Sequence, residues 1–327
     1  MSVTFSNRLG FMEQERDIHN IIAAINGRLV YNSIIGQVPS LHRYLFGNSL
    51  VAYLATFIPS LALLNSSRYI VEFTAQQLAR HQKETPFPNP SDRSPDMLSR
   101  FRRPKSDGSP AMSPSELLSH TSGNIFAGSD TTAASLRSIF YHLCRAPRAY
   151  EMLLAEIDAA DTAGNLSDPV TFAEGQALPF LQAVIKEALR MHPAVGLLLE
   201  RVVPEGGFTL PNGVALEAGT VVGMNPWVAA RDTAVYGADA ETFRPERWLE
   251  TDEEGLRMME RSFMAFGGGS RTCMGRHVSM LEMCKLVPQV LRRFEFDLAE
   301  PGREWEVRDY WFVQQSGLVV EVRRRWR

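Results

Sequence analysis

The cysteine at position 273 lies in a loop that could bring a thiolate close to a bound ligand. The stretch FGGGSRTCMG, Phe266 to Gly275, places three glycines at 267–269 ahead of Cys273. Glycine lets the backbone turn sharply and approach a partner closely. A cysteine just before a helix feels the amide dipoles of the helix N-terminus, and Arg271 is two residues away, so both favour the thiolate. The loop therefore indicates a thiolate ligand for a metal near the backbone, as in haem with a proximal thiolate.

The glycine run and the cysteine also have other possible uses. A run of glycines before a helix can bind phosphate, but the Gly-Lys-Ser/Thr ending of such a loop is absent. A lone cysteine is more often a packed core residue, and we expect that for Cys144 and Cys284. Three cysteines without a C-x-x-C pair argue against a disulfide framework and a structural zinc site, and they fit a reducing compartment.

A second polar segment, Ala127-Gly128-Ser129-Asp130-Thr131-Thr132, interrupts a predicted helix. That helix is predicted to start at the capping box Ser113–Glu116 and to stop near Pro147. Gly costs about 1 kcal/mol in a helix interior, and Ser, Asp and Thr compete for backbone hydrogen bonds. The segment predicts a local opening of the hydrogen-bond ladder, and the alternative is a satisfied kink without a role.

The elements around these segments are mostly helical. Residues 1–82 show helical spacing of apolar residues, and the Pro-rich residues 83–115 are predicted to be a solvent-exposed connection. Turn residues around Asn212-Gly213 predict a hairpin. Further predicted elements are helices over 181–191 and about 275–294, and strands over 208–210, 214–216, 220–224, 311–313 and 318–322.

Composition narrows the class of protein. The 327 residues are 45% hydrophobic with a formal net charge of -3, which fits a sizeable core and gives no reason to expect nucleic acid. Charged residues throughout the first twenty exclude a signal peptide there. The apolar stretch Leu50–Leu64 is too short to span a bilayer and contains Pro59. We expect a buried helix pair bent at Pro59, with a patch dipping into a membrane surface as the alternative.

The cysteine loop carries a family resemblance. Phe266-x-x-Gly269-x-Arg271-x-Cys273-x-Gly275 resembles the F-x-x-G-x-R-x-C-x-G signature of the cytochrome P-450 family. The resemblance implies a b-type haem (iron protoporphyrin IX) with Cys273 as the axial ligand and metal-binding residue. It further implies haem contacts from Phe266, Gly267 and Gly275, and propionate contacts from Arg271 and Arg201.

Two other segments resemble motifs of the same family. Glu187-Ala188-Leu189-Arg190 resembles its E-x-x-R helix motif, although this spacing occurs six times in the chain. Context favours position 187, and the resemblance implies that Glu187 and Arg190 pair with Arg247 in a buried network that holds the cysteine loop. The segment from Ala127 resembles the oxygen-binding A-G-x-D-T-T motif. Its implied roles are room over the iron at Ala127 and Gly128, and proton delivery by Asp130 and Thr131.

For the whole chain, the resemblance implies a mostly α fold with small β-sheets, the cytochrome P-450 fold lacking its N-terminal part. Residues 1–327 would form a single, incomplete catalytic domain of the fungal, membrane-bound, pisatin demethylase type, which serves secondary metabolism. The strands of 208–224 would then lack two partners and leave an exposed sheet edge.

The implied function is a haem-thiolate monooxygenase that hydroxylates or O-dealkylates an apolar small molecule with O2. Electrons would come from a separate NADPH-dependent reductase, because no flavin or nicotinamide motif is present. Residues 195–198 and 315–318 are candidate substrate contacts. The endoplasmic reticulum surface is implied by resemblance, with the cytoplasm as the alternative. Two rival functions are a haem-thiolate isomerase or dehydratase, against which Asp130-Thr131 speaks, and a truncated non-functional fragment.

Overall fold

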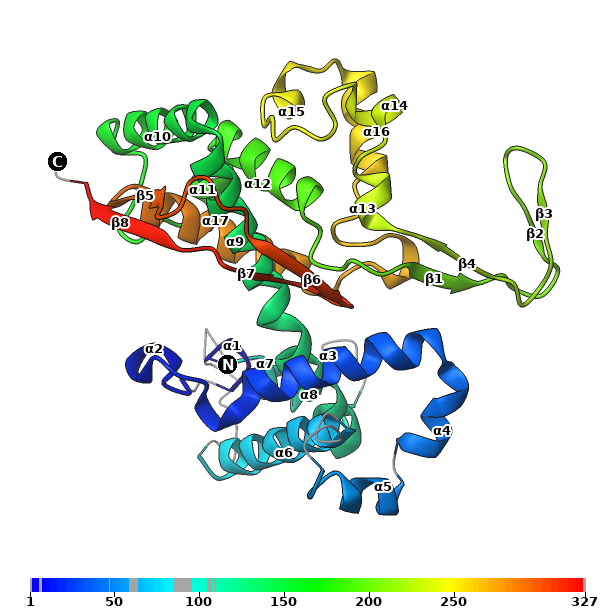
Figure 1. Cartoon of the computed structure of the whole chain (residues 1–327). Coiled ribbons are helices and arrows are strands. Elements are labelled where there is room, and N and C mark those ends of the chain that lie inside the picture. The colour runs from blue at the N-terminus through cyan, green and yellow to red at the C-terminus, as the bar shows by residue number, and fades with distance from the viewer. Residues whose placement is uncertain are drawn as a thin grey trace. The chain divides into compact units, whose positions relative to one another are not determined.

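The computed structural model (Figure 1) describes residues 2–5, 8–46, 48–58, 64–84, 96–104, 108 and 110–325. The chain divides into two compact units, Met1–Asp130 and Thr131–Arg327. Helices predominate in both, and the strands pair into small antiparallel sheets, which confirms the predicted fold class. The expectation of one domain over 1–327 stays a prediction.

Unit 1 is built on three packed helices. α3 (Ile21–Gln37) packs against α6 (Ser66–Glu84), and α6 packs against α8 (Pro114–Gly128). Apolar side chains at helical spacing, among them Ile25, Leu29 and Ile70, are buried between them. The remaining elements are short: α1 (Ser2–Phe5), α2 (Phe11–Gln14), η1 (Ile18–Asn20), η2 (Pro39–Leu41), α4 (His42–Leu45), α5 (Ser49–Leu54) and α7 (Met97–Phe101).

Two expectations for unit 1 need correction. The buried helix pair predicted over Leu50–Leu64 is wrong for its described part, because Leu50, Tyr53 and Phe57 of the α5 region are 64%, 62% and 68% exposed. Residues 59–63, including the predicted bend at Pro59, lie outside the described residues. No helix among the described residues is both long and apolar enough to cross a membrane.

The second correction concerns the connection predicted over 83–115. Residues 85–95, 105–107 and 109 are outside the described part, but α7 lies within the stretch and buries Leu98. Asp96 caps α7 by accepting a hydrogen bond from the Ser99 amide at 2.6 Å, and its other oxygen is 2.9 Å from His81 Nε2 of α6. A capped turn with one buried leucine is therefore part of the core, which proline content alone concealed.

Unit 2 has a helical core. Buried residues of α10 (Pro147–Thr162), α12 (Pro179–Met191) and α17 (Arg276–Leu291) meet α9 (Asp130–Arg145) in one apolar cluster. Figure 1 shows α12 and α17 together, with α11 (Phe172–Gln176) packed on both. α12 ends at the predicted His192-Pro193, and α17 ends three residues before the predicted Phe294, where a strand begins. The smaller helices are α13 (Pro226–Ala229), α14 (Thr233–Tyr236), α15 (Arg247–Glu250), α16 (Glu253–Ser262) and η4 (Gly269–Arg271).

The strands form two-stranded antiparallel pairs. The predicted hairpin is confirmed: β2 (Phe208–Thr209) pairs with β3 (Ala215–Leu216) across a turn in which Gly213 has φ +85°. β1 (Leu199–Val202) pairs with β4 (Val221–Met224) and, among the described residues, with no other strand. The other pairs are β5 (Phe294–Leu298) with β8 (Val320–Arg324), and β6 (Glu306–Tyr310) with β7 (Phe312–Ser316).

Candidate functional site

The cysteine loop is closed at its base by backbone hydrogen bonds. The Cys273 amide donates to the Phe266 carbonyl oxygen at 2.8 Å, and the Thr272 hydroxyl donates to the same oxygen at 3.2 Å. Gly267 and Gly269 have φ of +66° and +64°, a conformation that favours glycine. The Phe266 ring packs on the core of unit 2, so the loop is anchored at one end to the main apolar cluster.

The loop presents its thiol to solvent. All three cysteines lie in the described residues, and Cys273 is exposed, whereas Cys284 is buried and Cys144 is partly buried. Burial raises the pKa of the Cys284 thiol, and burial raises that of Cys144 to about 11. The two helical cysteines therefore behave as packed thiols, and Cys273 is the thiol that a ligand can reach.

A side chain of β1 reaches the cysteine loop. Arg201 donates from Nη2 to the Gly268 carbonyl oxygen at 3.3 Å and from Nη1 to the Glu200 carbonyl oxygen at 2.7 Å. Arg271, at the end of η4, is exposed on the loop itself. Two guanidinium groups are thus associated with the loop that holds Cys273.

The polar segment at the end of α8 coincides with a break in the helix. α8 ends at Gly128, Ser129 forms a turn, and α9 begins at Asp130. Ala127 and Gly128 are exposed, and a Cβ on Gly128 would meet no atom within 4 Å. The predicted interruption is present, and the boundary between the two units falls directly after Asp130.

Within unit 2, the start of α9 is tied to the helix that follows Cys273. The Oγ1 atom of Thr132 is 3.0 Å from the Oγ atom of Ser279 on α17. Thr132 also hydrogen-bonds to Glu282; burial raises the pKa of that carboxyl group, and this bond partly offsets the rise. Thr132, the neighbour of Thr131, is therefore fixed against α17. The sequence analysis missed Ser279 and Glu282 because neither belongs to one of its motifs.

The hairpin of β6 and β7 connects α9 with the segment ahead of β1. Gln315 Nε2 donates to the Ala134 carbonyl oxygen at 2.9 Å, and the Gly196 amide donates to the Trp311 carbonyl oxygen at 3.2 Å. Trp311 forms the tip of the hairpin with φ +79°, which is unusual for a residue with a side chain. The hairpin therefore contacts the candidate segment 195–198 at its tip, whereas the candidate segment 315–318 begins at the far end of β7, where Gln315 contacts α9.

Within unit 2, these contacts connect the cysteine loop to α17, α9, the β6–β7 hairpin and β1, and from β1 back to the loop. Cys273 leads along α17 to Ser279, and Ser279 contacts Thr132 of α9. From α9 the β6–β7 hairpin leads to Gly196 and then to β1, whose Arg201 returns to the cysteine loop. Through these contacts, the loop that holds Arg271 and Cys273 is connected both to Arg201 of β1 and to Thr132 at the start of α9.

The carboxylate of Glu187 accepts hydrogen bonds from both predicted arginines. Arg190 donates to its two oxygens at 2.8 and 2.9 Å, and Arg247 donates at 2.9 Å. Trp248 Nε1 and the Arg244 amide add bonds of 2.9 Å each. The side chains of Glu187, Arg190 and Arg247 are 0–2% exposed. The sequence analysis did not include Trp248, whose indole N–H adds a further donor to the Glu187 carboxylate.

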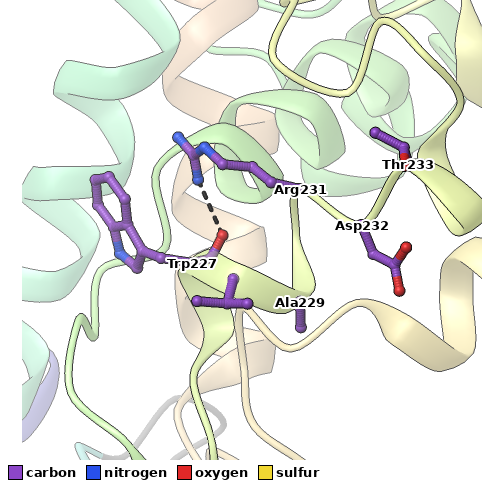
Figure 2. A pocket seen from close by; sticks show the side chains of 6 residues that line it. Trp227, Ala229, Arg231, Asp232 and Thr233 are labelled. Atoms are coloured by element: carbon purple, nitrogen blue, oxygen red, sulfur yellow. Dashed lines mark hydrogen bonds between the residues drawn. The ribbon is translucent and has the colours of Figure 1, made fainter.

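A surface hollow in unit 2 contains none of the predicted site residues. Figure 2 shows its lining side chains, with the dashed line marking the bond from Arg231 Nη1 to the Trp227 carbonyl oxygen at 3.2 Å. The lining residues are Trp227, Val228, Ala229, Arg231, Asp232 and Thr233. Its one carboxylate and one guanidinium do not form a metal-binding set, and it is lined by no thiol, so the cysteine loop remains the candidate site.

The donor set around Cys273 fits the expected haem. Haem with a thiolate ligand needs one cysteine sulfur that it can reach, and Cys273 presents an exposed sulfur just ahead of α17. A Cβ on Gly275 would lie 3.7 Å from that sulfur and one on Gly269 would meet nothing within 4 Å, so the loop is uncluttered. Guanidinium groups at 201 and 271 suit the two propionates.

Comparison with known proteins agrees with these features. The sequence model of the family described as Cytochrome P450 matches residues 1–319. The chain is 41% identical over 325 residues to the cytochrome P450 monooxygenase cicH of Emericella nidulans, covering 99% of this chain and 62% of that protein. It is 39% identical over 293 residues to a cytochrome P450 monooxygenase of Aspergillus terreus, covering 90% and 58%.

A third relative covers a larger share of both proteins. Cytochrome P450 monooxygenase ACRTS1 of Alternaria alternata is 34% identical over 324 residues, which are 99% of this chain and 84% of that protein. The chain spans about 60% of the length of the first two relatives. The family match over residues 1–319 includes the cysteine loop, the buried glutamate network and the interrupted helix. The chain belongs to the cytochrome P450 family.

Proposed function

We propose that this chain carries the haem-thiolate centre of a monooxygenase that inserts one atom of O2 into an apolar small molecule, by hydroxylation or O-dealkylation. The observation that carries the proposal is the loop of Cys273: an exposed thiol ahead of α17, in a backbone closed by the Cys273-to-Phe266 hydrogen bond. The names of the relatives support the reaction class.

The group that this loop would hold is a b-type haem. When bound, a thiolate-ligated haem supplies O2 activation, and the thiolate favours O–O cleavage. Cys273 would supply the thiolate ligand to the iron, and Arg201 and Arg271 would bind the propionates. Phe266 anchors the loop to the core. A Cβ on Gly275 would lie 3.7 Å from the thiol sulfur, and one on Gly267 would lie 3.7 Å from Leu199 of β1.

Asp130 and Thr131 would handle the protons that O–O cleavage requires. Both lie at the first turn of α9, directly after the interruption at Ser129. Ala127 and Gly128 contribute little bulk on the other side of that interruption. The Asp130 carboxylate would take protons from solvent, and the Thr131 hydroxyl would position the final hydrogen-bond donor of the proton path. An isomerase or dehydratase would not need this proton delivery.

Partners and location follow from the same proposal. Electrons would come from an NADPH-dependent reductase, and the substrate would contact residues 195–198 and 315–318. The exposed apolar residues of the α5 region, Leu50, Tyr53 and Phe57, support contact with a membrane surface, in keeping with the endoplasmic reticulum.

The test is the spectrum of the reduced, CO-treated chain after reconstitution with haem. The chain should show the absorption band typical of thiolate-ligated haem, and Cys273→Ala should lose it entirely because the other two cysteine thiols are buried or partly buried. Cys144→Ala is the matched control and should keep the band. A band that survives Cys273→Ala, or disappears in Cys144→Ala, would contradict the assignment, and failure to bind haem at all would favour a non-functional fragment.

A further inference from the structure

Unit 1 contains a long stretch of chain without negative charge. No aspartate or glutamate occurs between Asp17 and Glu72, whereas three arginines, at 28, 43 and 68, fall in this interval. Arg68 is paired with Glu72 at 2.7 Å on the surface of α6. The guanidinium of Arg43 lies 4.6 Å from the ring of exposed Tyr44. Of these three arginines, Arg28 is the one that is partly buried in unit 1.

The Arg28 guanidinium has few partners for its position. It projects from α3, is partly buried, and donates one hydrogen bond, from Nη1 to Ser67 Oγ of α6 at 2.5 Å. Within the described residues it has no carboxylate partner, although guanidinium carries five N–H donors. Each guanidinium nitrogen of Arg28 either has a hydrogen-bond partner or is in contact with solvent, so the unused donors remain accessible.

Burial lowers the pKa of Arg28, with the nearby Tyr31 partly offsetting the effect. Partial burial, with no carboxylate partner within the described residues, costs the cation part of its solvation. An anion arriving at the open donors would recover that loss. The energetics of the side chain therefore favour a negatively charged ligand.

Aromatic rings surround this cation. Its central carbon lies 5.3 Å from the Tyr31 ring and 5.6 Å from the Phe46 ring. The His42 ring stacks on Phe46 at 4.8 Å and 18°, and its Nδ1 is 2.8 Å from the Tyr31 hydroxyl oxygen. The Phe46 side chain is 49% exposed, so one wall of the cluster is open to a ligand.

We propose that Arg28, Ser67 and the rings of Tyr31, His42 and Phe46 form a binding site for the carboxylate of a small aromatic acid. The planar fork of a guanidinium matches a carboxylate with two parallel hydrogen bonds, and the half-exposed ring of Phe46 offers a flat apolar face to the rest of the ligand. The absence of acidic residues from 18 to 71 leaves the positive charge of Arg28 uncompensated along the chain. The site lies entirely in unit 1 and does not depend on the haem.

The experiment compares benzoate with benzyl alcohol, which has the same ring without the charge, in titrations of the full chain by calorimetry. Benzoate should bind more tightly. Arg28→Gln should weaken benzoate binding at least about tenfold and leave benzyl alcohol unchanged, and Arg28→Lys should be intermediate because it keeps the charge but loses the fork. Arg43→Gln, which removes a nearby exposed arginine, is the matched control and should change neither affinity.

A measurement on the unmodified chain guards against a variant that fails to fold. Benzoate, and not benzyl alcohol, should slow hydrogen exchange in peptides from residues 21–46. Equal binding of the two probes, or equal weakening by Arg28→Gln and Arg43→Gln, would overturn the proposal, because the cation would then be a structural clasp or part of a diffuse field. Arg28-dependent binding to phosphatidylserine vesicles without benzoate binding would also overturn it, since the anion would then be a lipid headgroup.

Discussion

At the scale of single residues, two adjacent threonines have different surroundings. Thr132 is buried and lies 3.0 Å from Ser279, whereas Thr131 is only partly buried at the first turn of α9. Thr131→Ala in a haem-loaded protein should leave haem content unchanged, lower the product formed per NADPH and raise the peroxide formed, because the proton delivery proposed for Thr131 would be impaired. Peroxide and product assays with a reductase measure both.

Thr132→Ala is the comparison for this experiment. It removes a hydrogen bond between helices and should lower the free energy of unfolding by about 1 kcal/mol without altering the peroxide yield. If Thr131→Ala left the ratio of product to NADPH unchanged, Thr131 would have no part in proton delivery.

Glu187 is the residue on which the buried network depends. Its carboxylate lies between the guanidinium groups of Arg190 and Arg247, and all three side chains are excluded from water. Glu187→Gln should lower the free energy of unfolding by about 3–5 kcal/mol, because two buried cations lose their counterion. Urea denaturation followed by circular dichroism measures the change.

The neighbouring residue provides a surface control. Lys186 donates to Glu260 at 2.8 Å, and these side chains are 36% and 52% exposed. Glu260→Gln should cost less than about 1 kcal/mol, since water screens an exposed pair. Equal costs for Glu187→Gln and Glu260→Gln would mean that the buried network does not stabilise unit 2.

At the scale of elements, the packing of α11 on α17 requires a glycine. A Cβ on Gly175 would lie 2.1 Å from the carbonyl oxygen of Cys284, which is a backbone atom of α17 and cannot rotate away. Gly175→Ala should therefore destabilise the protein by about 3 kcal/mol, the upper end for overpacking. The thermal midpoint of unfolding measures it.

Gly123 of α8 provides the opposite case. It is exposed in the helix interior, and a Cβ there would meet no atom within 4 Å. Gly123→Ala should stabilise the protein by about 0.5–1 kcal/mol through helix propensity alone. Similar midpoints for the two variants would show that α11 and α17 do not approach as closely as the structure has them.

At the scale of the molecule, resistance to acid depends on histidines in the aromatic cluster of unit 2. The His192 ring is 3% exposed and lies 4.9 Å from the Trp227 ring and 4.8 Å from the Trp305 ring. Burial, with added repulsion from His142 and Arg231, lowers the pKa of His192 to about 3. The folded protein therefore keeps this ring neutral far below the pH at which an unfolded chain protonates it.

This difference predicts a loss of stability in mild acid. Between about pH 6.5 and pH 3 the unfolded chain binds one more proton at position 192, so the free energy of unfolding falls as pH falls, by up to about 1.4 kcal/mol per pH unit. His192→Phe should flatten this dependence, whereas His120→Gln, at an exposed position, should not. Urea titrations at pH 7, 6 and 5 test it, and an unchanged slope in His192→Phe would contradict the lowered pKa.

Sequence alone determined the features that depend on neighbours within a few residues. The capping box at Ser113 and Glu116 and the turn at Gly213 follow from local backbone chemistry, and both are present as predicted. The break at Ser129 is present for the same reason, since its residues are poor helix formers. The cysteine loop is also local, because its closing hydrogen bond joins residues seven positions apart in Phe266–Gly275.

Tertiary structure decided which distant residues meet. The bond from Arg247 to Glu187 spans 60 positions, that between Thr132 and Ser279 spans 147, and that from Gln315 to Ala134 spans 181. Six pairs in the chain have the E-x-x-R spacing; context in the sequence favours the pair at 187, and the packing of α12 against α15 buries it. Composition likewise could not predict that Leu50 is exposed and that Arg28 is partly buried, because burial depends on what the rest of the fold places against each side chain.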